Sequence, residues 1–162
     1  MKKQNISMFL AASACILLLS AGCNSQDPVS YNNKIMEVMN TSTEDMNSMN
    51  DAMEKEDYAT AETVRKSWEA KLVKSSETIK GVGDFKGDSN FKNACVKAID
   101  SYKNAVSVDY KALIELRASQ KNGATVDENK INQTLNRIND SFEKASNDVN
   151  AASDKFEKDF AK

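Results

Sequence analysis

The sequence contains no histidine, and only one proline, three cysteines and five glycines among its 162 residues. The lack of histidine removes the commonest general base and the commonest transition-metal ligand, and it excludes the Glu-x-x-His pairs of di-iron helical bundles. Scarce glycine and proline, together with few β-branched or aromatic runs, favour long helices. We therefore expect an all-α protein, and the sequence identifies no catalytic, cofactor-binding or metal-binding residue.

The charge balance argues against a nucleic-acid partner. The chain has 22 basic and 24 acidic residues, and its length allows one domain with a sizeable core. Lys2 and Lys3 are the only charged residues in the first 22 positions, so the remainder has 20 basic against 24 acidic residues, a net charge of −4. No strongly basic region remains to hold phosphates.

Residues 1–22 have the pattern of a secretory leader. Lys2 and Lys3 form a charged start, a largely apolar core runs from Ile6 to Leu19, and the small residues Ser20 to Gly22 precede Cys23. This core of 14 residues is too short to span a bilayer as a helix. The pattern predicts cleavage of the leader rather than a transmembrane anchor.

The segment LSAGC, residues 19–23, resembles the lipobox of bacterial lipoprotein signal peptides. The resemblance implies that Cys23 becomes the first mature residue and carries a thioether-linked diacylglycerol and an acylated amine, such as palmitate. Several acyl chains hold a membrane firmly, because each buried methylene contributes about 0.8 kcal/mol. Ser20 stands where a leucine is usual, and an ordinary secreted protein cut near Ala21, with a free Cys23, is the alternative.

Residues 23–27 would then form a short lipidated tether. The four residues between Cys23 and Pro28, 24–27, reach at most about 13 Å when extended, so the folded part would lie close to the bilayer. Asn24, rather than an aspartate, follows the cysteine, which by the same resemblance favours the outer membrane over the inner one. Whether the protein faces the periplasm or the outside stays open.

Four helical stripes predict the fold of residues 28–162. Apolar residues recur every three or four positions over about 28–54, 57–80, 88–121 and 127–160. The stripe positions are Tyr31, Ile35, Met39, Ser42, Met46, Met49 and Met53; Tyr58, Ala61, Val64, Trp68, Leu72, Ser75 and Ile79; Phe91, Cys95, Ile99, Tyr102, Val106, Tyr110, Leu113 and Leu116; and Ile131, Leu135, Ile138, Phe142, Ala145, Val149, Ala152, Phe156 and Phe160. Asp27-Pro28 and Val126-Asp127 are start signals, and Gly123 is a stop signal. We expect an up-down-up-down antiparallel four-helix bundle.

Several residues invite a functional interpretation. Five methionines, Met36, Met39, Met46, Met49 and Met53, could bind Cu(I) or form an apolar groove. All except Met36 lie on the stripe, which favours core packing. Cys95 lies on a stripe with no histidine to activate it, which favours a buried, inert thiol over a nucleophile. The segment GVGDFKG, residues 81–87, lacks the spacing of a phosphate loop, so we expect a connection in which Phe85 covers the bundle end.

The polar aromatic residues leave two possibilities. They could line a ligand cavity, although we expect their rings to be buried with the hydroxyl or indole nitrogen directed at solvent. These residues are Tyr31, Tyr58, Trp68, Tyr102 and Tyr110.

The lipobox and the segment YNNKIMEVMN, residues 31–40, at the start of a bundle resemble small helical bacterial surface lipoproteins of unassigned function. The resemblance implies no catalytic residues. Our leading hypothesis is a non-enzymatic binding module, anchored through Cys23 in the bacterial envelope, with an envelope protein as its partner. A carrier of a small apolar ligand between the helices is the alternative, and an enzyme is disfavoured.

Overall fold

The computed structural model describes residues 27–161, in which every regular element is helical. The elements are α1 (Pro28–Asn40), α2 (Ser42–Glu54), α3 (Tyr58–Lys80), α4 (Asn90–Asn104), the π-helical segment η1 (Ala105–Tyr110), α5 (Lys111–Lys121) and α6 (Glu128–Phe160). The all-α prediction is confirmed for this range. The predicted leader and Cys23 lie outside the described residues.

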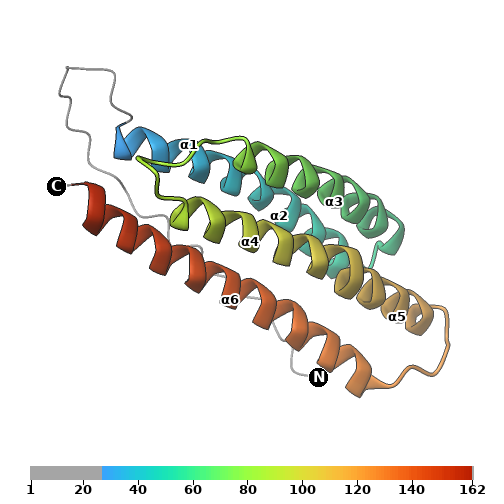
Figure 1. The fold of residues 1–162 in the computed structure, drawn as a ribbon. Coiled ribbons are helices and arrows are strands. Elements are labelled where there is room, and N and C mark those ends of the chain that lie inside the picture. Colours follow the sequence, from blue (N-terminus) through green and yellow to red (C-terminus); the bar gives the residue numbers. More distant parts are fainter. Residues whose placement is uncertain (1–26, 162) are drawn as a thin grey trace.

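The helices form a bundle in which α1 and α2 follow one another end to end, as do α4, η1 and α5 (Figure 1). α2 packs on α3, α3 on α4, and α4 on α6, while α1 contacts α3, α4 and α6. Figure 1 shows the connections 55–57 and 122–127 at one end, and the connection 81–89 at the other end, beside the start of α1. Because α6 has 33 residues, these two ends are about 50 Å apart.

Aspartates begin the first and last helices as the sequence predicted. The Asp27 carboxylate accepts the Ser30 backbone N–H at 2.9 Å, and Pro28 occupies the first turn, where a missing N–H costs nothing. The Asp127 side chain likewise accepts a backbone N–H in the first turn of α6. Gly123 follows α5 with φ at 84°, a left-handed conformation that favours glycine. These start and stop predictions are confirmed.

The predicted single helix 28–54 is wrong, because it is interrupted at Thr41. The Thr41 hydroxyl donates to the Val38 carbonyl at 2.7 Å, and its backbone N–H donates to the same oxygen at 3.3 Å. This tight turn uses fewer residues than a regular α-helical turn, so the following helix is re-phased. The buried face of α2 therefore contains Ser42, Asp45, Met49 and Ala52, whereas Met46 and Met53 are only partly buried.

The connection 81–89 closes one end of the bundle with an aromatic side chain. Phe85 is fully buried, and its ring lies 5.2 Å from that of Tyr31 and 5.0 Å from those of Phe156 and Phe160. Such ring pairs add stability beyond the area they bury. The predicted covering of the bundle end by Phe85 is confirmed.

The predicted helix 88–121 is not a uniform α-helix, because residues 105–110 form the π-helical segment η1. A π-helix bonds each N–H to a carbonyl five residues back, so one turn holds an additional residue. Two adjacent rows of side chains are consequently buried here. They are Ala105 with Asp109, and Val106 with Tyr110.

Candidate functional site

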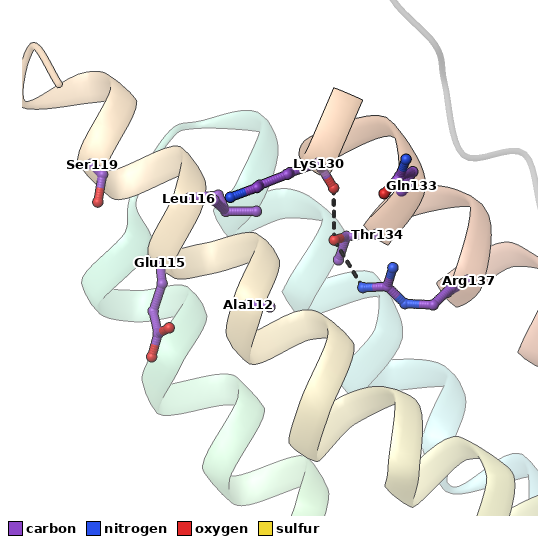
Figure 2. A pocket seen from close by; sticks show the side chains of 8 residues that line it. All are labelled: Ala112, Glu115, Leu116, Ser119, Lys130, Gln133, Thr134 and Arg137. Atoms are coloured by element: carbon purple, nitrogen blue, oxygen red, sulfur yellow. Dashed lines mark hydrogen bonds between the residues drawn. The ribbon is translucent and has the colours of Figure 1, made fainter. Parts of the chain in front are cut away.

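A groove between α5 and α6 is the candidate site (Figure 2). It has a volume of about 370 Å³ and lies toward the bundle end that carries the connection 122–127. α5 contributes Ala112, Glu115, Leu116 and Ser119, and α6 contributes Lys130, Gln133, Thr134 and Arg137. The groove thus combines a small apolar floor with charged and polar edges.

A hydrogen-bonded network fixes the α6 side of the groove. Arg137 Nε donates to Asp109 Oδ1 at 2.7 Å, and Arg137 Nη2 donates to the Thr134 hydroxyl at 3.0 Å. The Thr134 hydroxyl in turn donates to the Lys130 carbonyl at 2.8 Å. The Asp109 side chain is 8% exposed and that of Arg137 is 54% exposed, so the ion pair joins the interior to the surface. Arg137 is therefore held in one orientation at the groove edge.

The groove forms where short side chains face each other. In α5, Leu113 and Ile114 are buried in the core, whereas Ala112 and Leu116 remain partly exposed and line the groove. Thr134, which is also short, lies on the α6 side. The distance and contact between packed helices depend on the side chains at the crossing, so these residues leave space between α5 and α6.

The basic residues of the groove lie on α6 and its acidic residue lies on α5. Lys130 and Arg137 lie two turns apart on α6, and Figure 2 shows Lys130 extending toward α5. Glu115 lies on the α5 side. Within residues 27–161, neither the Lys130 ammonium nor the Glu115 carboxylate has an ion-pair partner. The α6 edge can therefore bind an anionic group.

In a second groove at the same end, the lining lysines already have partners. It has a volume of about 380 Å³ and lies between the start of α3 and the end of α5. The Lys121 ammonium donates to the Glu56 carbonyl at 2.8 Å and lies 5.7 Å from the centre of the Tyr58 ring. Lys55, the other lysine that lines this groove, is paired with Asp51 at 2.7 Å. Because both ammonium groups already have partners, the α5–α6 groove is the better candidate.

The structure places two sets of sequence candidates in the core. Cys95 is fully buried, and burial raises the pKa of its thiol to about 12. The predicted inert core cysteine is therefore supported. Met39 and Met49 are buried, while Met36, Met46 and Met53 pack partly exposed against the core, so packing explains the methionine-rich helix.

The prediction that the aromatic polar atoms point to solvent is wrong for Trp68 and Tyr31, and burial raises the pKa of Tyr110 to about 12, so its hydroxyl is also shielded from solvent. Trp68 is fully buried, and its indole N–H has no hydrogen-bond partner in the part of the chain that the structure describes. The Tyr31 hydroxyl donates to the Gly83 carbonyl at 3.0 Å. Rings from other helices enclose Trp68, since those of Tyr110 and Phe142 lie 5.7 and 5.9 Å from it. These residues pack the core.

Three residues of the candidate site were not predicted from the sequence: Asp109, Arg137 and Lys130. A signal was present for Asp109. From the stripe residue Val106, a step of three residues reaches Asp109 and a step of four reaches Tyr110, so either could continue the stripe. An acidic residue at a buried stripe position requires a cation nearby. Arg137 and Lys130 carried no such signal, because a charged residue on the polar face of a helix usually contacts water.

Residues 27–161 offer neither a membrane-spanning helix nor a cluster of metal ligands. No helix between residues 27 and 161 is both long and apolar enough to cross a membrane. The same range contains no group of three or more cysteine, aspartate or glutamate side chains placed to hold a metal ion.

Comparison with known proteins found no match. No protein-family model, no curated protein and no solved structure is significantly similar to this chain.

Proposed function

We propose that the protein is a bacterial envelope lipoprotein, held by lipid on Cys23, that acts as a non-enzymatic binding module. The observation that carries the binding role is the α5–α6 groove, where Lys130 and Arg137 present cationic groups beside an apolar floor. The Lys130 ammonium has no ion pair within residues 27–161. By contrast, the buried Arg65 is neutralised by Glu62 and Glu69 at 2.7 and 2.8 Å. The groove therefore presents a cationic group, the Lys130 ammonium, that can bind a partner.

We also infer the up-down-up-down order of the bundle. The connections lie alternately at the two ends, which supports a reversal of direction at each of them. Short connections between long helices favour antiparallel neighbours. In this arrangement the start of α1 and the groove lie toward opposite ends.

The lipobox resemblance and Asn24 support an outer-membrane location, and the partner is an envelope protein. The acidic balance of the chain supports the absence of a nucleic-acid partner. If the anchor is on Cys23, the groove lies on the end of the bundle away from the bilayer, where a partner can reach it.

Replacement of the anchor residue tests the membrane part of the proposal. Cys23→Ser removes the sulfur that would carry the diacylglycerol. We expect the wild type in the outer-membrane fraction and the variant in the soluble fraction, with mass spectrometry showing acyl groups on the wild-type N-terminal peptide only. An unlipidated Cys23 in the wild type would contradict this proposal.

Site-specific crosslinking tests the binding part. A photocrosslinking residue is placed at Gln133, which lines the groove, or at Asn47, an exposed position on α2. We expect one stoichiometric envelope protein to be captured from intact cells at position 133 and not at position 47. Equal capture at both positions would indicate nonspecific proximity and contradict a groove-directed partner.

The alternative function, a carrier of a small apolar ligand between the helices, has less support. Both grooves described above open to solvent and are lined largely by polar and charged side chains. Trp68, Phe142 and Leu72 fill the interior between the helices. A small apolar molecule that co-purified in native mass spectrometry would favour the carrier.

A further inference from the structure

We propose that the α5–α6 groove binds the free carboxyl terminus of a polypeptide that ends in an apolar residue. This inference rests on the proposed binding function and names the chemical class of the partner segment.

The cationic edge offers donors that are already oriented. Arg137 uses Nε for Asp109 and Nη2 for Thr134, and Nη1 makes no hydrogen bond within residues 27–161. The guanidinium is planar, so fixing two of its nitrogens also fixes the third. Lys130, two turns earlier on the same helix, supplies an ammonium without an ion pair. A carboxylate can be bound between these groups with charge-assisted hydrogen bonds.

The acids around the groove favour a single negative charge. Asp109 lies behind Arg137 and offsets part of its charge, and Glu115 lies on the opposite helix. Little positive charge is therefore left to balance the further charges of a polyanion. A monoanionic carboxylate matches the charge that Lys130 and Arg137 still offer.

The apolar floor of the groove favours an apolar side chain next to the bound carboxylate. Leu116 and Ala112 lie beside the cationic edge and are partly exposed. In the last residue of a polypeptide, the carboxylate and the side chain leave the same carbon atom, so both can reach adjacent subsites. An aspartate or glutamate side chain has only a short methylene stem for this floor. A chain terminus with an apolar side chain therefore fits better than an internal acidic residue.

The shape of the groove admits a chain end. Its volume of about 370 Å³ is at the lower end of the range for ligand sites, which suits a short terminal segment. The groove is open to solvent, so the preceding residues can leave it. Gln133 and Ser119 at its edges can bond the backbone amides of that segment. Capture of a terminal carboxylate is an established mode of peptide recognition.

Calorimetric titration of the full chain in detergent micelles tests the proposal. The probes are N-acetyl-Ala-Leu with a free carboxylate, the same dipeptide with an amidated terminus, and inorganic phosphate. We expect the free acid to bind at least about tenfold more tightly than the amide, since hydrogen bonds to a charged group are lost with the carboxylate. Phosphate should bind more weakly than the free acid, because it makes no use of the floor.

Three variants localise the binding. Lys130→Gln should weaken binding of the free acid about threefold to fivefold, which is typical of an exposed ion pair. Lys97→Gln, the same change at an exposed position on α4, should leave the affinity unchanged. Ala112→Phe should abolish binding by filling the floor. Arg137 is kept, because its loss would also leave Asp109 buried without a cation.

Several results would overturn the inference. These are equal binding of the acid and the amide, equal loss in the Lys130 and Lys97 variants, an unchanged affinity in the Ala112 variant, or phosphate binding as tightly as the free acid. If they occur while crosslinks from position 133 persist, the proposed function stands and only the terminal-carboxylate inference fails. If instead the wild-type protein proves unlipidated, the titration result is unaffected.

Discussion

Asp109 and Arg137 link the interior of the bundle to its candidate site. The Asp109 side chain is almost fully buried, and Arg137 Nε lies 2.7 Å from it. A buried carboxylate is costly unless it is paired and hydrogen-bonded, so the fold constrains Arg137 for reasons of stability. Binding at the groove then uses a guanidinium whose orientation the core has already determined.

We expect Arg137→Gln to lower the free energy of unfolding by about 1–3 kcal/mol, because Asp109 loses its charged partner while it stays buried. Asp109→Asn combined with Arg137→Gln should recover most of that loss, since two amides can bond each other without a buried charge. Urea unfolding followed by circular dichroism at pH 7 measures both effects.

The matched control is Arg117→Gln. Arg117 is 33% exposed and lies 4.0 Å from Glu128, and it also bonds Gln120. Removing this surface pair should change the free energy of unfolding by at most about 0.5 kcal/mol. Equal losses for Arg117 and Arg137 would contradict a special role for the buried pair.

The buried thiol of Cys95 and the buried hydroxyl groups of Tyr102 and Tyr110 predict that the protein loses stability at alkaline pH. Burial raises the pKa of Cys95 from 9.0 to about 12, and those of Tyr102 and Tyr110 from 10.0 to about 12. Above these ordinary values the unfolded chain releases protons that the folded chain keeps, so the free energy of unfolding falls as pH rises. Their stabilising contribution is complete below about pH 9 and is lost by about pH 12.

Cys95→Ala separates the thiol from the tyrosines. Between pH 9 and 10 the thiol titrates before the tyrosines do in the unfolded chain. The variant should therefore show a smaller decline in unfolding free energy over that interval than the wild type, even if its stability at pH 7 is lower. Urea titrations at pH 7, 9, 10 and 11 measure this. Parallel declines in both proteins would show that another group is responsible.

At the level of elements, η1 is the irregularity that shapes the groove region. It holds Asp109 in the interior and leads directly into α5, whose Ala112 forms part of the floor. π-helical turns inside α-helices frequently occur at functional sites. Here the additional residue lets the acid and the neighbouring Tyr110 both be buried.

Deletion of one residue from η1 should be tolerated. Val108 is 55% exposed, and its removal converts the π turn into an α turn while α4 and α5 keep their register. We expect a folded protein whose melting temperature changes by a few degrees. Deletion of Val73, which is 42% exposed but lies within the regular α3, should prevent folding, because every later residue of α3 rotates by about 100°.

Thermal unfolding by circular dichroism compares the two deletions. Both remove an exposed valine, so the difference between them reports the local helix geometry rather than the lost side chain. If both proteins unfold alike, residues 105–110 do not contain an additional residue relative to an α-helix.

At the level of the whole molecule, the two ends have different roles in the proposal. The start of α1 and the aromatic cover at Phe85 occupy one end, and the groove lies toward the other. The 33 residues of α6 separate these ends by about 50 Å. A lipid on Cys23 would therefore place the Phe85 end near the bilayer and the groove away from it.

Fluorescence quenching in reconstituted vesicles tests this orientation. A fluorophore is attached to cysteine introduced at Lys86 or at Asn122, and the vesicles carry a quencher on their lipid headgroups. We expect strong quenching at position 86 and weak quenching at position 122, because only the first position lies within reach of the tether. Equal quenching would indicate that the bundle lies flat on the bilayer and would contradict an upright arrangement.

The sequence determined the helical class, the starts at Asp27 and Asp127, the stop at Gly123 and the burial of Cys95. These features depend on neighbours along the chain. Capping involves atoms three residues apart, and a helical stripe repeats every three or four positions, so local periodicity is sufficient to reveal them.

Only the tertiary structure decided the break at Thr41, the π turn at 105–110 and the groove. The break, the π turn and the groove each depend on which of two adjacent residues faces another helix. A single irregular turn changes which residues face that helix, and the apolar periodicity does not reveal such a turn. The pairing of Asp109 with Arg137 joins residues 28 positions apart, and no periodicity links them. Side chains that meet only after the helices pack leave no local pattern, which is why the candidate site was not found in the sequence.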